Sequence, residues 1–219
     1  MKTALRVIGT MSEDKYKRRG VPLVVSAPSG GGKTTLCHKL IAAVDDVAFS
    51  VSYTTRPQRG QEQHGVDYYF VSDEEFDDLV NDSALLEWAH VHGHRYGTHR
   101  ARTEELLAAG KDVLFDIDIQ GGEQIAESLS DAVLLFILPP NKATLEERLR
   151  GRLSDSEEQI LRRLKAAESE IDDAGFYHYW IINKELEPAL EEMKGLLLTE
   201  RLKRLDKASL RNNFLQPGE

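Results

Sequence analysis

The chain has 219 residues, of which 41% are hydrophobic and 30% charged, and its formal net charge is −9. This composition is typical of a globular protein and excludes disordered and fibrous classes. The acidic balance argues against a broad nucleic-acid-binding surface, which needs an excess of cations, but local arginines can still bind a small anionic substrate. The single cysteine excludes an internal disulfide and fits a reducing compartment, so we expect a cytoplasmic protein.

The N-terminal residues show no pattern typical of a folded element. MKTALRVIGT lacks the uninterrupted apolar stretch of a secretion signal, and residues 12–20 are polar. We expect residues 1–20 to form a loose leader, with Met11 as an alternative start. The longest apolar run, AVLLFIL at 132–138, is far too short to cross a bilayer, so we expect no membrane partner.

From residue 21 onward, short apolar runs alternate with helical patterns. Val21–Ser26 is an apolar run bounded by turn residues, and from Lys33 the apolar residues fall on one face of a helix. A final amphipathic helix is expected from about Pro188. Such alternation predicts an α/β fold with a parallel sheet covered by helices on both faces. Its other buried strands are expected at 112–118, 132–138 and 177–182.

Two segments do not follow this alternation and are interpreted as insertions. Residues 49–98 contain short strand patterns around one helix, which Ser72 and Glu75 open as a capping box. Residues 148–173 are dense in charge and contain a helix with an apolar stripe. The expected division is a leader at 1–20, a core formed by 21–52, 99–147 and 174–219, and insertions at 53–98 and 148–173.

The stretch SAPSGGGKTT at 26–35 is close to the phosphate-loop pattern, although Ala27 stands where that pattern has its first glycine. Glycines let successive backbone N–H groups point at phosphate oxygens, and an alanine is tolerated at 27 if its φ is negative. The alternative, an exposed glycine turn, is disfavoured by the strand before it and the helix after it. Lys33 would reach the β- and γ-phosphates, and the Thr34 hydroxyl would ligate Mg²⁺. The predicted ATP-binding residues are Ala27, Pro28, Ser29, Gly30, Gly31, Gly32, Lys33, Thr34 and Thr35.

Four segments, in order, resemble the motifs of guanylate kinases: SAPSGGGKTT, SVSYTTRPQRGQEQHGVDYYF, LLEWAHVHGHRYGT and DVLFDIDIQGG. The similarity runs from about Val21 to about Arg204. The resemblance implies a three-layer P-loop nucleoside monophosphate kinase fold and transfer of the γ-phosphoryl group of ATP to GMP, and also to dGMP, with Mg²⁺. It also implies that the insertion at 53–98 binds GMP and that the insertion at 148–173 is a helical lid.

The acceptor phosphate is assigned to arginines and tyrosines of the first insertion. A dianionic phosphate is best held by the planar fork of arginine. The resemblance places Arg56, Arg59, Tyr68 and Tyr96 at this phosphate.

The resemblance assigns the guanine base to a carboxylate and two hydroxyls. A carboxylate accepts two adjacent donors from the edge of guanine, whereas adenine would offer it a bare lone pair. Glu87 matches the base-reading residue of the family, and Ser52 and Thr98 match the hydroxyls beside it. Asp116 and Asp118 match an acidic pair near the acceptor and the metal. A structural role as a helix cap stays open for Asp118.

The lid arginines Arg148, Arg152 and Arg163 match those that grip ATP and the transferring phosphate in the family, and with Lys33 and Arg56 they form the predicted catalytic set. Asn183 matches a residue beside the adenine. Leu153 departs from the family pattern, which usually has glycine there.

The histidines and the cysteine have alternative interpretations, and two alternative functions stay open. The histidines at 90, 92, 94 and 99 are interpreted as a solvent-facing strand rather than a zinc site, and Cys37 as a core residue. A P-loop kinase with another acceptor is one alternative function. A non-catalytic protein-binding module of the same fold is another, but such modules tend to lose the loop lysine and the lid arginines, which are retained here.

Overall fold

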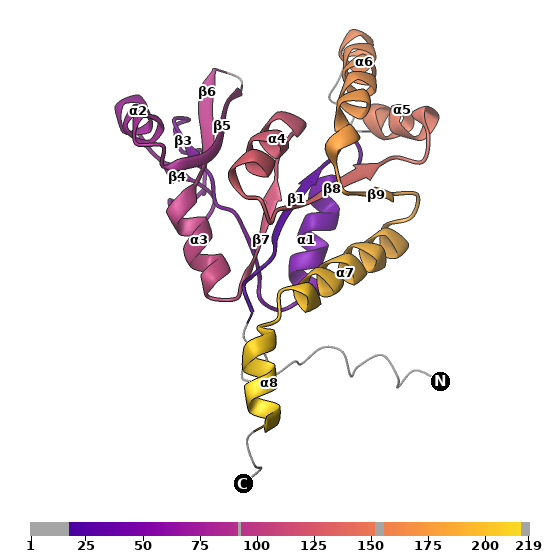
Figure 1. Cartoon of the computed structure of the whole chain (residues 1–219). Helices are drawn as coiled ribbons and strands as arrows, with labels where there is room; N and C mark the ends of the chain where they lie inside the picture. Colours follow the sequence, from indigo (N-terminus) through magenta and orange to yellow (C-terminus); the bar gives the residue numbers. More distant parts are fainter. Residues whose placement is uncertain (1–17, 92, 152–155, 216–219) are drawn as a thin grey trace.

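The computed structural model describes residues 18–91, 93–151 and 156–215. Its core is a parallel five-stranded sheet with the order β2-β7-β1-β8-β9 (Figure 1). The α/β fold with a central parallel sheet is therefore confirmed. The five strands are β1 Pro22–Ser26, β2 Val47–Phe49, β7 Asp112–Asp116, β8 Val133–Leu138 and β9 Tyr179–Ile182.

Helices cover both faces of this sheet, as its apolar composition requires. The helix α1 (Lys33–Ala43) and the helix α7 (Leu186–Lys203) pack on one face, where Cys37 is fully buried. The helix α3 (Arg100–Ala108) and the helix α4 (Ile119–Ser128) pack on the other face. Burial raises the pKa of the Cys37 thiol to about 12, which fits its expected role as a core residue.

A second, four-stranded sheet has the order β4-β3-β6-β5. The helix α2 (Asp73–Asn81) lies beside it, and the predicted capping box is confirmed because the side chains of Ser72 and Glu75 each accept from the other's backbone N–H. The side chain of Gln124 in α4 contacts the backbone of Trp88 on both its N–H and its C=O. These contacts join the second sheet to the core. Its strands are β3 Tyr53–Thr54, β4 Tyr69–Phe70, β5 Leu85–Val91 and β6 His94–His99.

Two further helices stand on the other side of α4 from the second sheet (Figure 1). They are α5 (Lys142–Arg150) and α6 (Glu157–Asp173), and they share a small apolar cluster. The predicted stripe of α6 is confirmed: Ile160, Leu164 and Ala167 are buried and Ile171 is partly buried. A short 3₁₀ helix η1 (Ala174–Phe176) leads from α6 to β9, and α8 (Lys207–Leu215) is the last described helix.

The expectation of a fully buried strand at 177–182 is wrong. The strand begins at Tyr179 and lies at the edge of the sheet, so Trp180 and Ile182 are 42% and 58% exposed while Ile181 is buried. The other edge strand, β2, is too short to have been recognised from its sequence pattern. In the part of the chain that the structure describes, no helix is long and apolar enough to span a membrane.

The carboxylate of Asp112, at the start of β7, ties three segments together. It is 1% exposed, and Oδ1 accepts from the Arg18 guanidinium at 2.6 Å and from the Val21 N–H at 2.9 Å. Its Oδ2 accepts from Arg201 Nε of α7 at 2.6 Å. Residues 1–17 of the predicted leader lie outside the described residues, whereas Arg18 forms part of this buried network.

We expect Asp112→Asn to lower the free energy of unfolding by about 3 kcal/mol, because it leaves two largely buried guanidinium groups without their anion. Urea denaturation followed by circular dichroism measures this change. The matched control is Glu187→Gln, which removes an exposed ion pair with Lys39 and should cost less than about 1 kcal/mol. Equal losses in the two variants would contradict the prediction.

Candidate active site

The loop between β1 and α1 has the backbone geometry of a phosphate cradle. Gly30 and Gly32 have φ angles of 91° and 90°, in the left-handed region that favours glycine, and the Gly31 N–H donates to Pro28 O at 2.8 Å. The only non-glycine residues with positive φ in the described chain are Asp46 and Ser83. The φ of Ala27 is therefore not positive, and the condition for an alanine at this position is met.

The outer side of this loop is held by two predicted ATP-site residues. The buried amide of Asn183 donates from Nδ2 to Gly31 O at 2.9 Å, and Arg148 Nη2 donates to Asn183 O at 2.8 Å. A Cβ at Gly32 would collide with this Asn183 amide. Arg148 Nη1 also donates to Gly31 O at 3.5 Å, so both side chains contact the loop backbone and bring a guanidinium beside it.

The ammonium of Lys33 lies at the ends of β1 and β7. Its Nζ is 2.7 Å from Asp116 Oδ1 and donates to Ile117 O at 2.6 Å. Asp118 is exposed and accepts from the Gly121 N–H as the N-cap of α4. The capping role that the sequence left open for Asp118 is therefore present, and Asp116 is the one of the pair that contacts the loop lysine.

The predicted acceptor-phosphate residues form one cluster around Arg56. This arginine is buried, its Nε donates to Tyr96 OH at 3.2 Å, and its guanidinium carbon lies 5.2 Å from the centre of the Tyr68 ring. Glu62, which the sequence analysis did not single out, accepts from Nη2 at 2.7 Å and from Nη1 at 3.0 Å. Glu62 also accepts from the Arg59 N–H at 2.8 Å, while the Arg59 side chain is exposed.

Hydrogen bonding explains the charge states in this cluster. The Glu62 carboxylate, and to a smaller extent the Tyr96 hydroxyl, raise the pKa of Arg56 above its ordinary value despite desolvation. In turn Arg56, followed by the Arg59 N–H, lowers the pKa of Glu62. The pair is therefore fully ionised at neutral pH.

The predicted base-reading pair is in contact and buried. Thr98 Oγ1 donates to Glu87 Oε1 at 2.7 Å, and the two residues are 1% and 7% exposed. Burial raises the pKa of Glu87 to about 7, and the charge of Asp118 adds to the rise, while the hydrogen bond from Thr98 opposes it. Ser52 is partly buried on the chain segment that enters the second sheet. A buried carboxylate with free acceptor capacity is suited to a ligand with adjacent N–H donors.

The other predicted residues lie on α1, on α6 or outside the described chain. Thr34 and Thr35 are exposed in the first turn of α1, and Arg163 is partly buried on α6. Arg152 and Leu153 lie outside the described residues, as does His92 of the histidine group. Among the described residues, no group of three or more histidine, cysteine or acidic side chains could hold a metal ion by itself.

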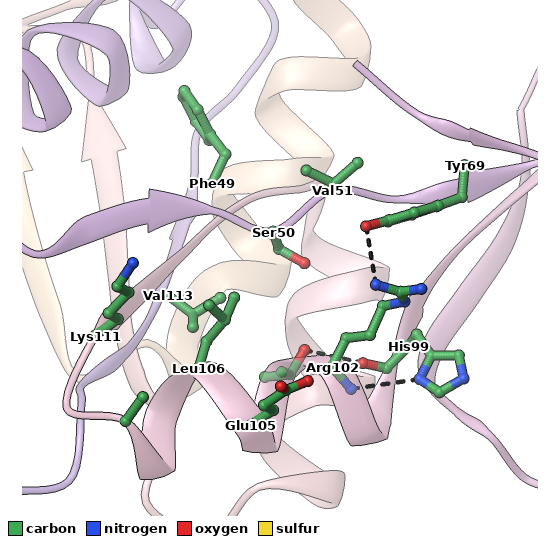
Figure 2. A pocket seen from close by; sticks show the side chains of 12 residues that line it. Phe49, Ser50, Val51, Tyr69, His99, Arg102, Glu105, Leu106, Lys111 and Val113 are labelled. Atoms are coloured by element: carbon green, nitrogen blue, oxygen red, sulfur yellow. Dashed lines mark hydrogen bonds between the residues drawn. The ribbon is translucent and has the colours of Figure 1, made fainter. Parts of the chain in front are cut away.

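A pocket of about 310 Å³ lies away from the predicted site, between α3, β7 and the segment that leads from β2 into β3. In Figure 2, Arg102 reaches across it to Tyr69, and Nη1 donates to the tyrosine OH at 3.0 Å. Arg102 Nε also donates to Tyr53 OH at 2.8 Å, and the Tyr53 and Tyr69 rings stack at 4.6 Å. None of the predicted site residues lines this pocket. Residue alternation places Tyr53 and Tyr69 on the opposite strand face from Ser52 and Tyr68.

The family model for guanylate kinase matches residues 19–200 of this chain. The chain belongs to the guanylate kinase family. It is 51% identical to the guanylate kinase of Anaeromyxobacter dehalogenans over 198 residues, covering 88% of each chain. It is 48% identical to that of Syntrophotalea carbinolica over 184 residues, covering 84% of this chain and 88% of the relative.

Structural similarity agrees with this membership. The crystal structure of guanylate kinase from Anaplasma phagocytophilum is 33% identical, with a TM-score of 0.69 over 93% of this chain and 99% of that chain. The family and the fold predicted from the sequence motifs are thus confirmed.

The guanylate kinase family implies Mg²⁺, and the oxygen donors beside the loop fit it. Mg²⁺ prefers hard oxygen ligands and usually takes one or two protein ligands together with substrate phosphates and water. The hydroxyl of Thr34, on the helix that follows the loop, and the carboxylate of Asp116, at the end of the strand β7 beside β1, are such donors. The lack of a larger acidic cluster in the described chain is compatible with a metal held mainly by phosphates.

We expect the stability of the protein to depend on pH through Glu87. Its folded pKa, about 7, lies above the ordinary value of 4.5, so the stability it contributes is complete below about pH 4.5 and is lost as the pH rises through about 7. Between about pH 5 and about pH 8, the wild type should lose about 2.5 kcal/mol more than Glu87→Gln. Urea denaturation of both proteins at the two pH values measures the difference, and parallel losses would contradict it.

Proposed function

We propose that this protein transfers the γ-phosphoryl group of ATP to GMP, and to dGMP, giving ADP and GDP or dGDP. The observation that carries the proposal is the buried Glu87–Thr98 pair, joined through α4 to a core that holds a lysine-bearing phosphate loop. Membership of the guanylate kinase family supports the same reaction. In this proposal, the phosphate loop is the site for the triphosphate, and the Arg56 cluster together with the Glu87–Thr98 pair is the site for the guanine nucleotide.

On the donor side, we assign the triphosphate to the loop. Backbone N–H groups of the loop and the N-terminal end of α1 (Lys33–Ala43) would bind the phosphate oxygens. Lys33, which contacts Asp116 and Ile117 O, would turn its ammonium to the β- and γ-phosphates. Asn183, whose side-chain amide donates to Gly31 O of the loop, is assigned to the adenine side.

On the acceptor side, we assign the GMP phosphate to Arg56, Arg59, Tyr68 and Tyr96. The donors of Arg56 are already largely used, since Nε contacts Tyr96 OH, and Nη1 contacts both Pro57 O and Glu62. Its Nη2 keeps one N–H beyond the bond to Glu62. That N–H, the exposed Arg59 fork and the two tyrosine hydroxyls would hold the phosphate.

For the base, we assign Glu87 as the acceptor of the adjacent donors of guanine, with Ser52 and Thr98 completing its contacts. A base without these donors would leave a buried carboxylate unpaired, which is a strong basis for rejecting it. Asp116 is assigned to the acceptor and the metal, and Asp118 more weakly to the acceptor.

An oxygen of the acceptor phosphate attacks the γ-phosphorus, and the bond to the β–γ bridging oxygen breaks with its electrons leaving on ADP. No general base is required, because the attacking oxygen belongs to a phosphate dianion. Positioning and charge stabilisation therefore supply most of the rate, and we assign these to Lys33, Arg56, Arg148, Arg152 and Arg163. Mg²⁺, held by Thr34 and indirectly by Asp116, would neutralise phosphate charge when bound.

We place the reaction in the cytoplasm, because the single cysteine is a buried thiol that fits a reducing compartment. The product is a purine nucleoside diphosphate, so the reaction belongs to purine nucleotide metabolism. The non-catalytic module is disfavoured, since Lys33 and Arg148 are both present and in contact with the loop region.

ADP formation with ATP and Mg²⁺ against a panel of GMP, dGMP, AMP, CMP and UMP tests the proposal. We expect turnover on GMP and dGMP alone, and a loss of at least about 100-fold in kcat for Lys33→Ala, which removes a charge that stabilises the transferring group. Turnover on another acceptor would overturn the guanine assignment. GMP binding without any turnover would make the protein a binding module.

We expect Glu62→Gln to raise the KM for GMP on the order of 10-fold with little change in kcat, because a neutral amide no longer fixes the Arg56 fork from both sides. Steady-state kinetics with varied GMP at saturating ATP measures this change. The control is Glu74→Gln, an exposed residue of α2 outside the cluster, for which the KM should not change. An unchanged KM in Glu62→Gln would show that Arg56 does not need this partner.

A further inference from the structure

A carboxylate from α6 occupies one backbone donor of the phosphate loop. The Ser29 N–H donates to Glu170 Oε2 at 3.3 Å, across 141 positions of sequence. Ser29 belongs to the loop whose N–H groups bind phosphate oxygens, whereas Glu170 lies on α6, within the segment expected to be the lid. A protein carboxylate therefore contacts a donor that a phosphate group of ATP would use.

The packing of α5 and α6 against the loop holds Glu170 in position for this contact. Leu145 and Leu149 of α5 lie so close to Gly30 that a Cβ added there would be 3.0 Å from each side chain. The same leucines form the apolar cluster with Ile160, Leu164 and Ala167 of α6. Glu170 follows Ala167 by one helical turn, so the cluster holds its carboxylate over the loop.

The charges around Glu170 belong to the same site. It is partly buried, and desolvation, the largest cause, raises its pKa, which the Ser29 N–H opposes. The charge of Asp118 raises it further and the charge of Lys33 lowers it. Lys33 itself is paired with Asp116. The loop N–H and the loop lysine are thus each matched to a protein carboxylate.

We propose that Glu170 is a displaceable latch, whose carboxylate holds α6 on the phosphate loop and competes with a phosphate oxygen of ATP for the Ser29 N–H. This inference rests on the proposed ATP site. Two anions do not share one N–H at hydrogen-bond distance, because their repulsion is strong where water is partly excluded. ATP therefore binds the loop only as Glu170 leaves it.

The latch has a consequence for α6. When the Glu170 carboxylate leaves the loop, the end of α6 nearest to β9 loses its hydrogen bond to Ser29. The apolar cluster still connects α6 to α5. Occupation of the loop by a triphosphate is thereby coupled to the position of the helix that carries Arg163. Glu170 acts here as a positioning residue, because it reaches the substrate site only through the loop backbone.

The test is the equilibrium affinity for ATP without GMP, measured by displacement of N-methylanthraniloyl-ADP. Glu170→Gln keeps an oxygen that can accept from Ser29 but removes the charge, so ATP should bind on the order of 10-fold more tightly. Glu168→Gln is the matched control on the same helix, since Glu168 makes an exposed ion pair with Lys142, and the affinity of this variant for ATP should stay within about two-fold of the wild type. Thermal melting checks that each variant is folded.

Glu170→Asp provides a second variant that retains the charge but is one methylene too short to keep the contact. We expect it also to bind ATP more tightly than the wild type, by less than Glu170→Gln. Unchanged or weaker ATP binding in both variants would overturn the latch. Wild-type ATP binding without phosphoryl transfer to GMP would instead overturn the proposed function and leave the latch to be judged by the affinities alone.

Discussion

The position of β1 is the constraint on which the rest of the structure depends. This strand pairs on one side with β7 and on the other with β8, and all five of its residues are buried. Its backbone is therefore fixed in every direction up to Ser26, where the loop begins. Because parallel strands end at the same edge of a sheet, the end of β7 delivers Asp116 to the lysine that follows this loop. The sheet therefore fixes the position at which the loop begins.

Electrostatic pairing has the same form at both proposed phosphate sites. Arg56 is held by Glu62, Lys33 by Asp116 and the Ser29 N–H by Glu170. Cationic and N–H groups that are proposed to bind phosphates must be kept in place without being left unpaired, since an unpaired buried charge is costly. Nearby carboxylates satisfy that requirement in a protein whose net charge is −9. The same carboxylates set how strongly a phosphate must bind to compete.

Sequence patterns were sufficient for the central sheet, the family and the capped helix at Ser72, because these depend on local periodicity and on motifs of contiguous residues. The edge strand β2 and the exposure of Trp180 could not be predicted, because they depend on which strand ends a sheet. Glu62 and Glu170 were missed for a similar reason. Glu62 stands within a recognised motif but has no role until Arg56 folds onto it, and Glu170 meets Ser29 only through the packing of α6. The roles assigned to the site residues stay predictions.

The placement of the two tryptophans gives the molecule a pair of built-in optical probes. Trp88 lies in β5 next to Glu87, edge-on to Phe76 at 6.2 Å, and is therefore beside the proposed guanine site. Trp180 lies in the edge strand β9 of the core sheet, 4.8 Å from Phe136, and is 42% exposed. The strand β8 separates it from β1, which leads into the loop. With one indole in each sheet, intrinsic fluorescence can distinguish events in the nucleotide-acceptor half from events in the core, without any added label.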